Sequence, residues 1–426
     1  MDLSPSRRGA WIVNTSKHLS EINPSHPGLS HLENIDFAGK CGNLLITLSG
    51  DTTEQLSLRR VKTHARNCGI GGPELTTSYL PTLKAYGCLD WDATGNTYEV
   101  LAFSRQRVLA TTSDILSGLA LSGFERVLPD LLEFCLLRPR LSSEVKEYLS
   151  DLLVEEDADH LIELVSSFEL LGVAETIDQR QKLYFNRYQF GDKVKGIAKA
   201  LPMLSDERRE ELDEAIERVG RRPGMPLDEL RLSESAKGLA VGLGILDVSK
   251  VPSPSGSVEF VTSAGLAPPS VGSQTSHLED DVFHHAKMLL SSFRYGQLRS
   301  TVSRGRINDP AVLVDRLLSQ GEVGPCTAIG QDYVPLEASG VIRTVRAGDR
   351  VGNQFSMQLR RREPAQIVLD LFESGVSDTI AARSVPQNLQ LPLGYTGPEA
   401  PQVAAYRRIV RHDAKSVRAF MEGLRT

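Results

Sequence analysis

The sequence has few of the residues that usually reveal a protein's chemistry or location. Aromatic residues make up only 6% of the 426 residues. No apolar run approaches the length of about eighteen residues that a transmembrane helix needs, which excludes such a helix. The first residues also lack the apolar core and small-residue cleavage site of a signal peptide. Apolar residues nevertheless make up 40% of the chain, so we expect most of it to fold as two to four domains.

Cysteine is scarce, odd in number and scattered along the chain. No two cysteines form a Cys-x-x-Cys pair; the five are Cys41, Cys68, Cys88, Cys135 and Cys326. Isolated cysteines predict reduced thiols in a cytoplasmic protein rather than a disulfide framework. His64 and Cys68 have a spacing that two zinc ligands on one helix face can adopt, but no further spacing supports a site. We therefore expect no metal ion.

Catalytic signatures are missing as well. The glycine-rich stretch at 68–73 lacks the Lys-Ser/Thr pair of a phosphate-binding P-loop, and no Gly-x-Ser-x-Gly occurs. A His-x-Lys triplet at 285–287 stands alone, whereas phospholipase-D-type nucleases need two copies. The acidic run at 155–160 is typical of a helix start, where carboxylates complement the helix dipole. The sequence therefore predicts a protein that is not an enzyme and binds no cofactor.

Charge is distributed unevenly along a chain whose net charge is −6. Residues 1–110 are near neutral, residues 111–290 carry a net −12, and residues 291–426 carry a net +5. Such asymmetry indicates that different segments meet different partners. A basic segment suits phosphates and an acidic one repels them. The alternative is that the charge of solvent-exposed helix faces varies along the chain without any function.

One local pattern occurs four times: a helical apolar stripe, a glycine, and an alternating hairpin-like segment. The glycines at the four junctions are Gly87, Gly172, Gly244 and Gly340. A glycine after a helix supplies the left-handed residue that helix C-caps favour. Alternating residues around a turn rich in Gly, Asn and Asp then predict a hairpin. We expect hairpins near 88–102, 173–190, 245–262 and 341–359, and helices near 126–138, 142–152 and 157–171 in the second repeat.

Three helices, a glycine and a two-stranded wing follow one another in the order of a winged helix. The sequence resembles a tandem array of winged-helix domains, a resemblance of pattern that names no specific family. It implies a mainly α fold with short β-hairpins and repeated helix-turn-helix plus wing domains. The boundaries that follow are an N-terminal arm (1–44), repeat 1 (45–110), acidic repeat 2 (111–192), repeat 3 (193–263), a linker (264–280), basic repeat 4 (281–383), and a connector with a C-terminal basic helix (384–426).

The arm is predicted to be loop-rich, because Asn-Pro and His-Pro-Gly lie inside it. It is also a candidate docking segment.

The fourth hairpin carries the strongest functional signal of the chain. Arginines surround it; they are Arg343, Arg346, Arg350, Arg360, Arg361 and Arg362. The planar guanidinium group of arginine can donate two hydrogen bonds to one phosphate, and it also fits into narrow minor grooves. Arg304 and Arg306 lie in the segment before it. A helix from Thr327 to Ser339 would then enter the major groove, with Gln331 and Tyr333 available to contact bases.

Two functions of different classes remain open. In the first, the chain is a non-enzymatic nucleic-acid-binding subunit of a larger assembly, with duplex DNA as the favoured ligand. Basic outer repeats would then contact the backbone, and the acidic middle region would bind a protein partner. In the second, the winged helices form a protein–protein scaffold without nucleic-acid contact. The overall acidity favours the scaffold, whereas the clustered arginines favour nucleic acid.

Overall fold

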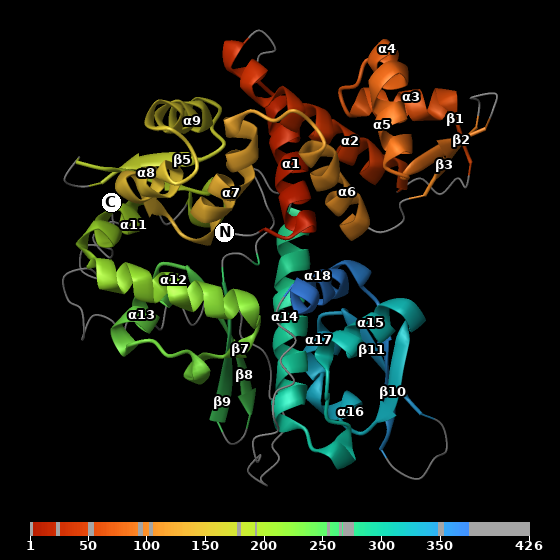
Figure 1. Ribbon diagram of the computed structural model, residues 1–426. Coiled ribbons are helices and arrows are strands. Elements are labelled where there is room, and N and C mark those ends of the chain that lie inside the picture. Colours follow the sequence, from red (N-terminus) through yellow and green to blue (C-terminus); the bar gives the residue numbers. More distant parts are fainter. Residues whose placement is uncertain are drawn as a thin grey trace. The chain divides into compact units, whose positions relative to one another are not determined.

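The computed structural model describes residues 3–22, 26–49, 55–92, 97–101, 105–176, 180–191, 194–253, 256–263, 266, 277–347 and 353–374. These residues form two compact parts, an N-terminal part up to Gly191 and a C-terminal part from Asp192 onward (Figure 1). The fold is mainly helical with small antiparallel sheets, as the sequence predicted. Within the described ranges, no helix is both long and apolar enough to cross a membrane.

Four modules share one order of elements: a helix, a strand, two helical segments and a two-stranded hairpin. Module 1 (33–100) consists of α2 (Glu33–Ser49), β1 (Leu56–Ser57), α3 (Leu58–Asn67), α4 (Gly72–Glu74), η2 (Leu75–Tyr79), α5 (Leu80–Ala85), β2 (Leu89–Trp91) and β3 (Thr97–Val100). Module 2 (123–185) consists of α7 (Gly123–Leu137), β4 (Arg140–Leu141), α8 (Ser142–Ser150), α9 (Glu155–Ser167), β5 (Gly172–Glu175) and β6 (Lys182–Phe185).

The same order continues in the C-terminal part. Module 3 (206–263) consists of α12 (Asp206–Arg221), β7 (Met225–Pro226), η5 (Leu227–Glu229), α13 (Glu234–Gly242), β8 (Leu246–Ser253) and β9 (Gly256–Ser263). Module 4 (310–359) consists of α15 (Pro310–Gln320), β10 (Glu322–Cys326), α16 (Ile329–Asp332), α17 (Val334–Ala338), β11 (Ile342–Arg346) and β12 (Phe355–Leu359). The elements outside the modules are α1 (Pro5–Leu19), η1 (Pro27–Leu32), α6 (Arg105–Ser117), α10 (Arg187–Phe190), α11 (Val194–Ala200), η4 (Leu201–Met203), α14 (His277–Arg299), η7 (Val302–Arg304) and α18 (Arg362–Ser374).

Each module has a three-stranded sheet with the same topology. The last strand of the module lies in the centre, and the strand orders are β1-β3-β2, β4-β6-β5, β7-β9-β8 and β10-β12-β11. The four predicted hairpins are confirmed, but the expectation of two strands per sheet was wrong. The missed first strand is two residues long in modules 1 to 3. A strand of that length has no alternating pattern to read.

The junction between the last helix and the hairpin has one geometry in all four modules. The N–H of the left-handed residue bonds the carbonyl three residues back, and the next N–H bonds the carbonyl five residues back, which is a Schellman motif. Gly87, Gly244 and Gly340 occupy the left-handed position with φ values of 66°, 72° and 71°. In module 2 the prediction of Gly172 was wrong, because Glu169 holds this position with φ 56°.

Gly172 is instead the first residue of β5. A Cβ atom there would lie 2.5 Å from the Phe185 ring and 2.9 Å from Arg187 Cγ. Close packing therefore explains this glycine, and the backbone conformation does not require it.

The N-terminal segment is helical, and the expectation of a loop-rich arm was wrong. Ser4 caps α1, whose Pro5 stands where a helix tolerates proline. Helices α1 and α2 pack on each other and on α6, and Trp11 is 1% exposed. Of the proline signals in this segment, Pro27 begins η1, and Pro24 lies outside the described residues.

Helix α14 connects modules 3 and 4 within the C-terminal part. It contacts β8 and β9 on one side and α17 and α18 on the other. Lys287 Nζ lies 2.6 Å from Asp247 Oδ2, and Tyr295 packs with Val251 and Phe260. Most of the predicted linker 264–280 and all of 384–426 lie outside the described residues, although α14 begins at His277.

Candidate nucleic-acid interface

The fourth hairpin presents exposed arginines on β11 and directly after β12. Strands β11 and β12 are antiparallel, with Arg343 opposite Gln358 and Arg346 opposite Phe355. Arg343, Arg346 and Arg360 are exposed. Arg343 lies on the face opposite that of Met357, which is 1% exposed and belongs to the core. The sheet thus buries one face in the module and leaves Arg343 on the other, as alternation along a strand requires.

Arg343, Arg346 and Arg360 have no ion-pair or hydrogen-bond partner for their side chains among the described residues. The remaining arginines of the run are partly engaged. Arg361 Nη1 lies 3.2 Å from His285 Nδ1, and Arg362 Nη2 donates to the carbonyl of Leu318 at 2.8 Å. Arg350 lies outside the described residues. Each of these three guanidinium groups suits phosphate, although alternation places Arg343 and Arg346 on opposite faces of β11.

Two carboxylates limit the positive surface. Glu322 on β10 accepts a hydrogen bond from Gln358 at 2.9 Å. Gln358 is also the residue that pairs with Arg343 across the hairpin, so this carboxylate lies in the same row as Arg343. Glu337 on α17 accepts from the N–H and hydroxyl of Thr344. The arginines at the ends of the hairpin are thus better placed for an anion than the middle of the sheet.

Arg304, Arg306 and Gln331 are engaged in hydrogen bonds within the C-terminal part. Arg304 Nη2 lies 2.7 Å from Asp332 Oδ1 and 2.9 Å from Gln331 Oε1. Asp332 is 3% exposed and also accepts a hydrogen bond from Ser300. Arg306 Nε donates to the carbonyl of Gln297 at 2.8 Å. Arg304 thus holds η7 against α16, and Arg306 holds the segment after η7 against α14.

Tyr333 is a core residue, which contradicts its predicted contact with bases. It is 2% exposed, and its ring packs edge-to-face with Phe293 at a centroid distance of 5.7 Å. The predicted helix from Thr327 to Ser339 is two short helices, α16 and α17. Pro335 explains the break, because it cannot bond the carbonyl of Gln331 and its ring clashes with that carbonyl. Module 4 therefore has an exposed hairpin and two short helices in place of the predicted long helix.

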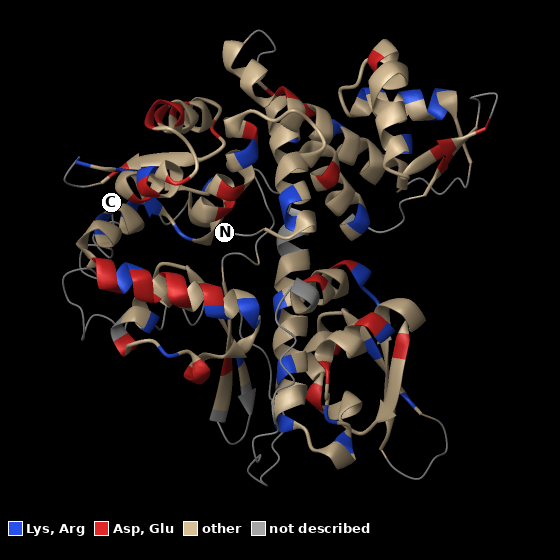
Figure 2. Cartoon of the chain, in the orientation of Figure 1, with Lys and Arg blue, Asp and Glu red and all other residues tan. Residues whose placement is uncertain are grey.

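Many of the acidic residues of module 2 lie on its third helix, α9. Glu155, Glu156 and Asp157 occupy the first turn of α9 and are exposed (Figure 2). Two large apolar side chains are exposed at the turn before it, Leu152 at 48% and Val154 at 69%. Carboxylates beside exposed apolar groups suit a basic, partly apolar protein segment and repel a phosphate backbone.

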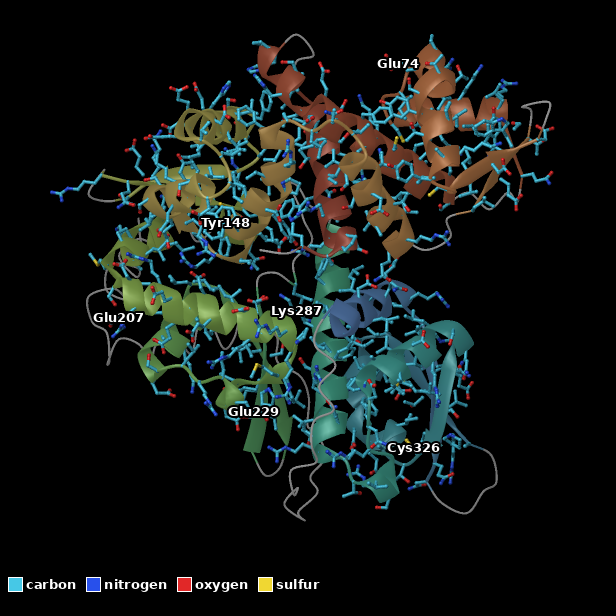
Figure 3. The ribbon with its side chains drawn as sticks, viewed as in Figure 1. Glu74, Tyr148, Glu207, Glu229, Lys287 and Cys326 are labelled. Carbon is cyan, nitrogen blue, oxygen red and sulfur yellow. The ribbon has the colours of Figure 1, made fainter. Side chains whose placement is uncertain are left out.

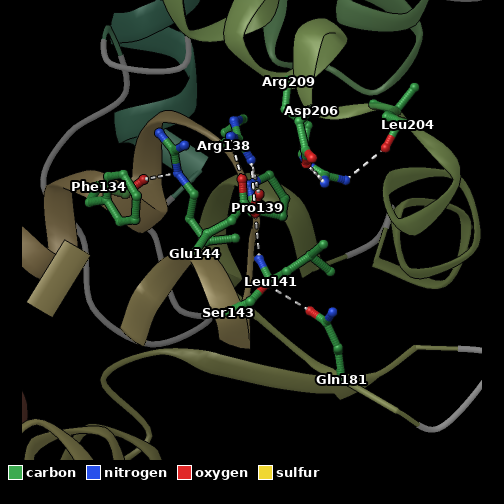
Figure 4. Close-up of polar contacts among 11 residues, drawn as sticks. Phe134, Arg138, Pro139, Leu141, Ser143, Glu144, Gln181, Leu204, Asp206 and Arg209 are labelled. Atoms are coloured by element: carbon green, nitrogen blue, oxygen red, sulfur yellow. Dashed lines mark hydrogen bonds and ion pairs between the residues drawn. The ribbon is translucent and has the colours of Figure 1, made fainter. Parts of the chain in front are cut away.

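A buried ion pair at the start of α8 was not found from the sequence. Arg138 is 1% exposed, and its Nη2 lies 2.7 Å from Glu144 Oε1 (Figure 4). Glu144 also accepts from the Leu141 N–H at 2.8 Å. Burial by itself would raise the pKa of Glu144, but the hydrogen bonds and charge of Arg138 lower it below the ordinary value. A glutamate three residues into a helix was the available signal.

Four of the five thiols are buried, and that of Cys326 is half-buried. All five cysteines are free, and burial raises the pKa of Cys68 and Cys326 and that of Cys135 to about 12. A raised pKa leaves the thiol protonated and unreactive at neutral pH. In the part of the chain that the structure describes, no group of three His, Cys, Asp or Glu side chains is arranged to hold a metal ion.

Comparisons with protein families, with curated protein sequences and with solved structures find no match to this chain.

Proposed function

We propose that the chain is a non-enzymatic, tandem winged-helix protein that binds duplex nucleic acid, with DNA favoured, as a subunit of a larger assembly. The shared order of elements supports the fold assignment. A helix, a strand, two helical segments and a hairpin with the last strand central recur in four modules. The order agrees with the winged-helix resemblance of the sequence.

The exposed arginines of the fourth hairpin carry the functional proposal. Arg343, Arg346 and Arg360 are exposed on one hairpin and lack protein partners among the described residues. A wing lying along a duplex would place them at phosphates, where each contact releases counterions and makes binding salt-sensitive. Because Tyr333 is buried and Gln331 is engaged by Arg304, we propose that module 4 contacts the backbone and does not read bases.

Binding to a labelled duplex, measured over a range of salt concentrations, tests this proposal. Each lost phosphate contact lowers the slope of log affinity against log salt by about 0.9 for duplex DNA. We expect the double variant Arg343→Ala/Arg346→Ala to lower the slope by about 1.8 and to weaken binding to all sequences alike.

The matched control is Arg218→Ala/Arg221→Ala on α12, which removes the same charge from an exposed helix where both arginines pair with glutamates. Equal binding by the hairpin variant and the parent at every salt concentration would exclude the fourth wing as the contact.

The acidic surface of module 2 favours a second candidate function, a protein–protein scaffold. The exposed carboxylates of α9 lie next to the exposed Leu152 and Val154. We expect Glu155→Ala/Glu156→Ala/Asp159→Ala to leave duplex binding unchanged and to reduce the amount of any protein that co-purifies with the parent. If the parent binds no duplex at low salt but retains a partner through this surface, the scaffold function replaces the first proposal.

A further inference from the structure

The second and third helical segments of the four modules occupy equivalent positions but differ sharply in charge. In module 1 the stretch 58–85 contains five basic residues and one acidic residue, whereas the equivalent stretch 142–167 of module 2 contains one basic and eight acidic residues. Module 3 has two basic and three acidic residues at 227–242, and module 4 has two acidic and no basic residues at 329–338. Of the four, only the module 1 helix pair is positive (Figure 2).

The positive charge of module 1 lies on the exposed side of α3. Arg59 and Arg66 are exposed and Lys62 is half-buried, and their spacing of three and four residues places them along one face. Val61 and Ala65 are at most 1% exposed and attach the opposite face to the core. No acidic residue occurs in α3. Helix α3 therefore contains no carboxylate that could neutralise its basic residues, whereas the arginines of α12 pair with glutamates of the same helix.

A four-residue turn joins α3 to a continuous helical run at 72–85. Gly69 in this turn has φ 72°, and α3 contacts α4. The run buries Leu75, Tyr79 and Leu83, all at most 6% exposed, and so fixes which face remains outside.

That outer face carries small hydroxyl side chains. Thr76, Thr77 and Ser78 are exposed, and both threonine hydroxyls donate to the Pro73 carbonyl at 3.0 Å. Their oxygens remain available as acceptors. Glu74 is the one carboxylate of the run. It is the last residue of α4 and so lies near the beginning of the run (Figure 3). Lys84 is engaged at the other end, 2.7 Å from Asp90 and over the Trp91 ring.

We infer that this helix pair of module 1 is a second duplex-binding surface, on which α3 contacts phosphates and the run at 72–85 enters the major groove. The inference deepens the proposed function and rests on it. A groove about 12 Å wide admits a helix with its side chains, and Ser and Thr hydroxyls bond to base edges of either kind. Sequence readout then belongs to module 1, and module 4 supplies backbone contact alone.

The phosphate part of the inference is tested with Arg59→Ala/Arg66→Ala and a labelled duplex. Two lost contacts lower the salt slope by about 1.8. The control is again Arg218→Ala/Arg221→Ala, which changes the net charge equally and leaves the slope at the parent value. A slope for the α3 variant equal to that of the parent overturns the inference.

The groove part is tested by repeated selection of bound duplexes from a random-sequence DNA pool. The parent protein enriches a subset of sequences, whereas Thr76→Ala/Thr77→Ala/Ser78→Ala loses that enrichment and retains the salt slope. Alanine favours helix over threonine and serine, so circular dichroism and the melting temperature should stay at the parent values. Enrichment of the same sequences by both proteins overturns the groove contact.

The hairpin variant Arg343→Ala/Arg346→Ala separates this inference from the proposed function. A lowered slope for the α3 variant together with an unchanged slope for the hairpin variant refutes the fourth-wing contact and supports the module 1 surface. The reverse result supports the fourth wing and refutes module 1. If the parent protein binds no duplex at low salt, both are refuted.

Discussion

At the scale of single residues, the same backbone geometry is reached with different side chains. Three of the four helix-to-hairpin junctions use glycine in the left-handed position, and the fourth uses Glu169. A non-glycine residue there costs about 1–2 kcal/mol, because its Cβ approaches the following carbonyl oxygen. The hydrogen bonds of the motif still form in module 2, so the surrounding packing holds Glu169 in this conformation.

We therefore predict that Glu169→Gly stabilises the N-terminal part by about 1 kcal/mol. The loss of the Glu169–Arg187 ion pair subtracts little, because the Glu169 side chain is largely exposed to solvent and that of Arg187 is partly exposed. Urea unfolding followed by tryptophan fluorescence measures this, since Trp11 and Trp91 are the two tryptophans of the chain and both lie in that part. Arg187→Gln is the control for the lost pair. A lower urea midpoint for Glu169→Gly would show that glutamate is favoured there.

The buried pair of Arg138 and Glu144 predicts a specific pH dependence. Because the native pKa of Glu144 is lowered, the pair contributes stability above the ordinary glutamate value of about 4.3 and loses it as pH falls through the native value. We expect Glu144→Gln to cost about 3–5 kcal/mol at pH 7, because it leaves Arg138 buried without a counter-charge. The difference in urea midpoint between the two proteins should shrink toward pH 3. A difference independent of pH would contradict this account.

At the scale of elements, helices α1, α2 and α6 approach closely because glycines lie between them. A Cβ atom on Gly39 would lie 2.3 Å from Ser16 Cβ, and one on Gly42 would lie 2.4 Å from the Thr112 hydroxyl. A Cβ atom on Gly9 would overlap the carbonyl of Leu109. Backbone carbonyls are among the neighbours of Gly9 and Gly39, so no side-chain rotation can make room at these two positions. The three-helix contact thus depends on residues without side chains.

Gly39→Ala is accordingly expected to destabilise the N-terminal part by about 1–3 kcal/mol, since α1 and α2 must move apart. Gly72→Ala is the matched control, because a Cβ atom at that position meets nothing within 4 Å. The same fluorescence-monitored urea titration compares the two variants. Equal midpoints would show that the helices can separate without cost.

At the scale of the whole molecule, each compact part contains two modules and the helices that support them. In the C-terminal part, α14 lies C-terminal to the proline-rich segment 264–277 but packs on β8 and β9, which precede that segment. The chain thus returns to module 3 after its most linker-like sequence.

We predict that limited proteolysis cuts first within 264–277, because this segment is small, polar and rich in proline. The fragments near 1–268 and 278–426 should still elute together in gel filtration, because Lys287 and Tyr295 on α14 hold the module 3 sheet. They should separate in denaturant. Separation under native conditions would mean that this contact is weak.

The sequence by itself determined the elements that repeat and carry a local signal. The four hairpins, the three helices of module 2 and three left-handed glycines were all readable from periodicity and turn residues. Short first strands, the break of the module 4 helix at Pro335 and the role of Glu169 were not, because each depends on pairing or packing with distant residues.

The tertiary structure also decided which charged and aromatic residues remain available. Tyr333 is enclosed by the core and Arg304 is bound by Asp332, while Arg343 and Arg346 remain exposed. All four are plausible contacts in the sequence, where burial is invisible. Charge, by contrast, is fully written in the sequence, and the predicted repeats already set a basic stretch in repeat 1 against an acidic one in repeat 2. The structure adds the bounds of the helix pairs at 58–85 and 142–167, and it shows that Arg59, Arg66 and Thr76 are exposed.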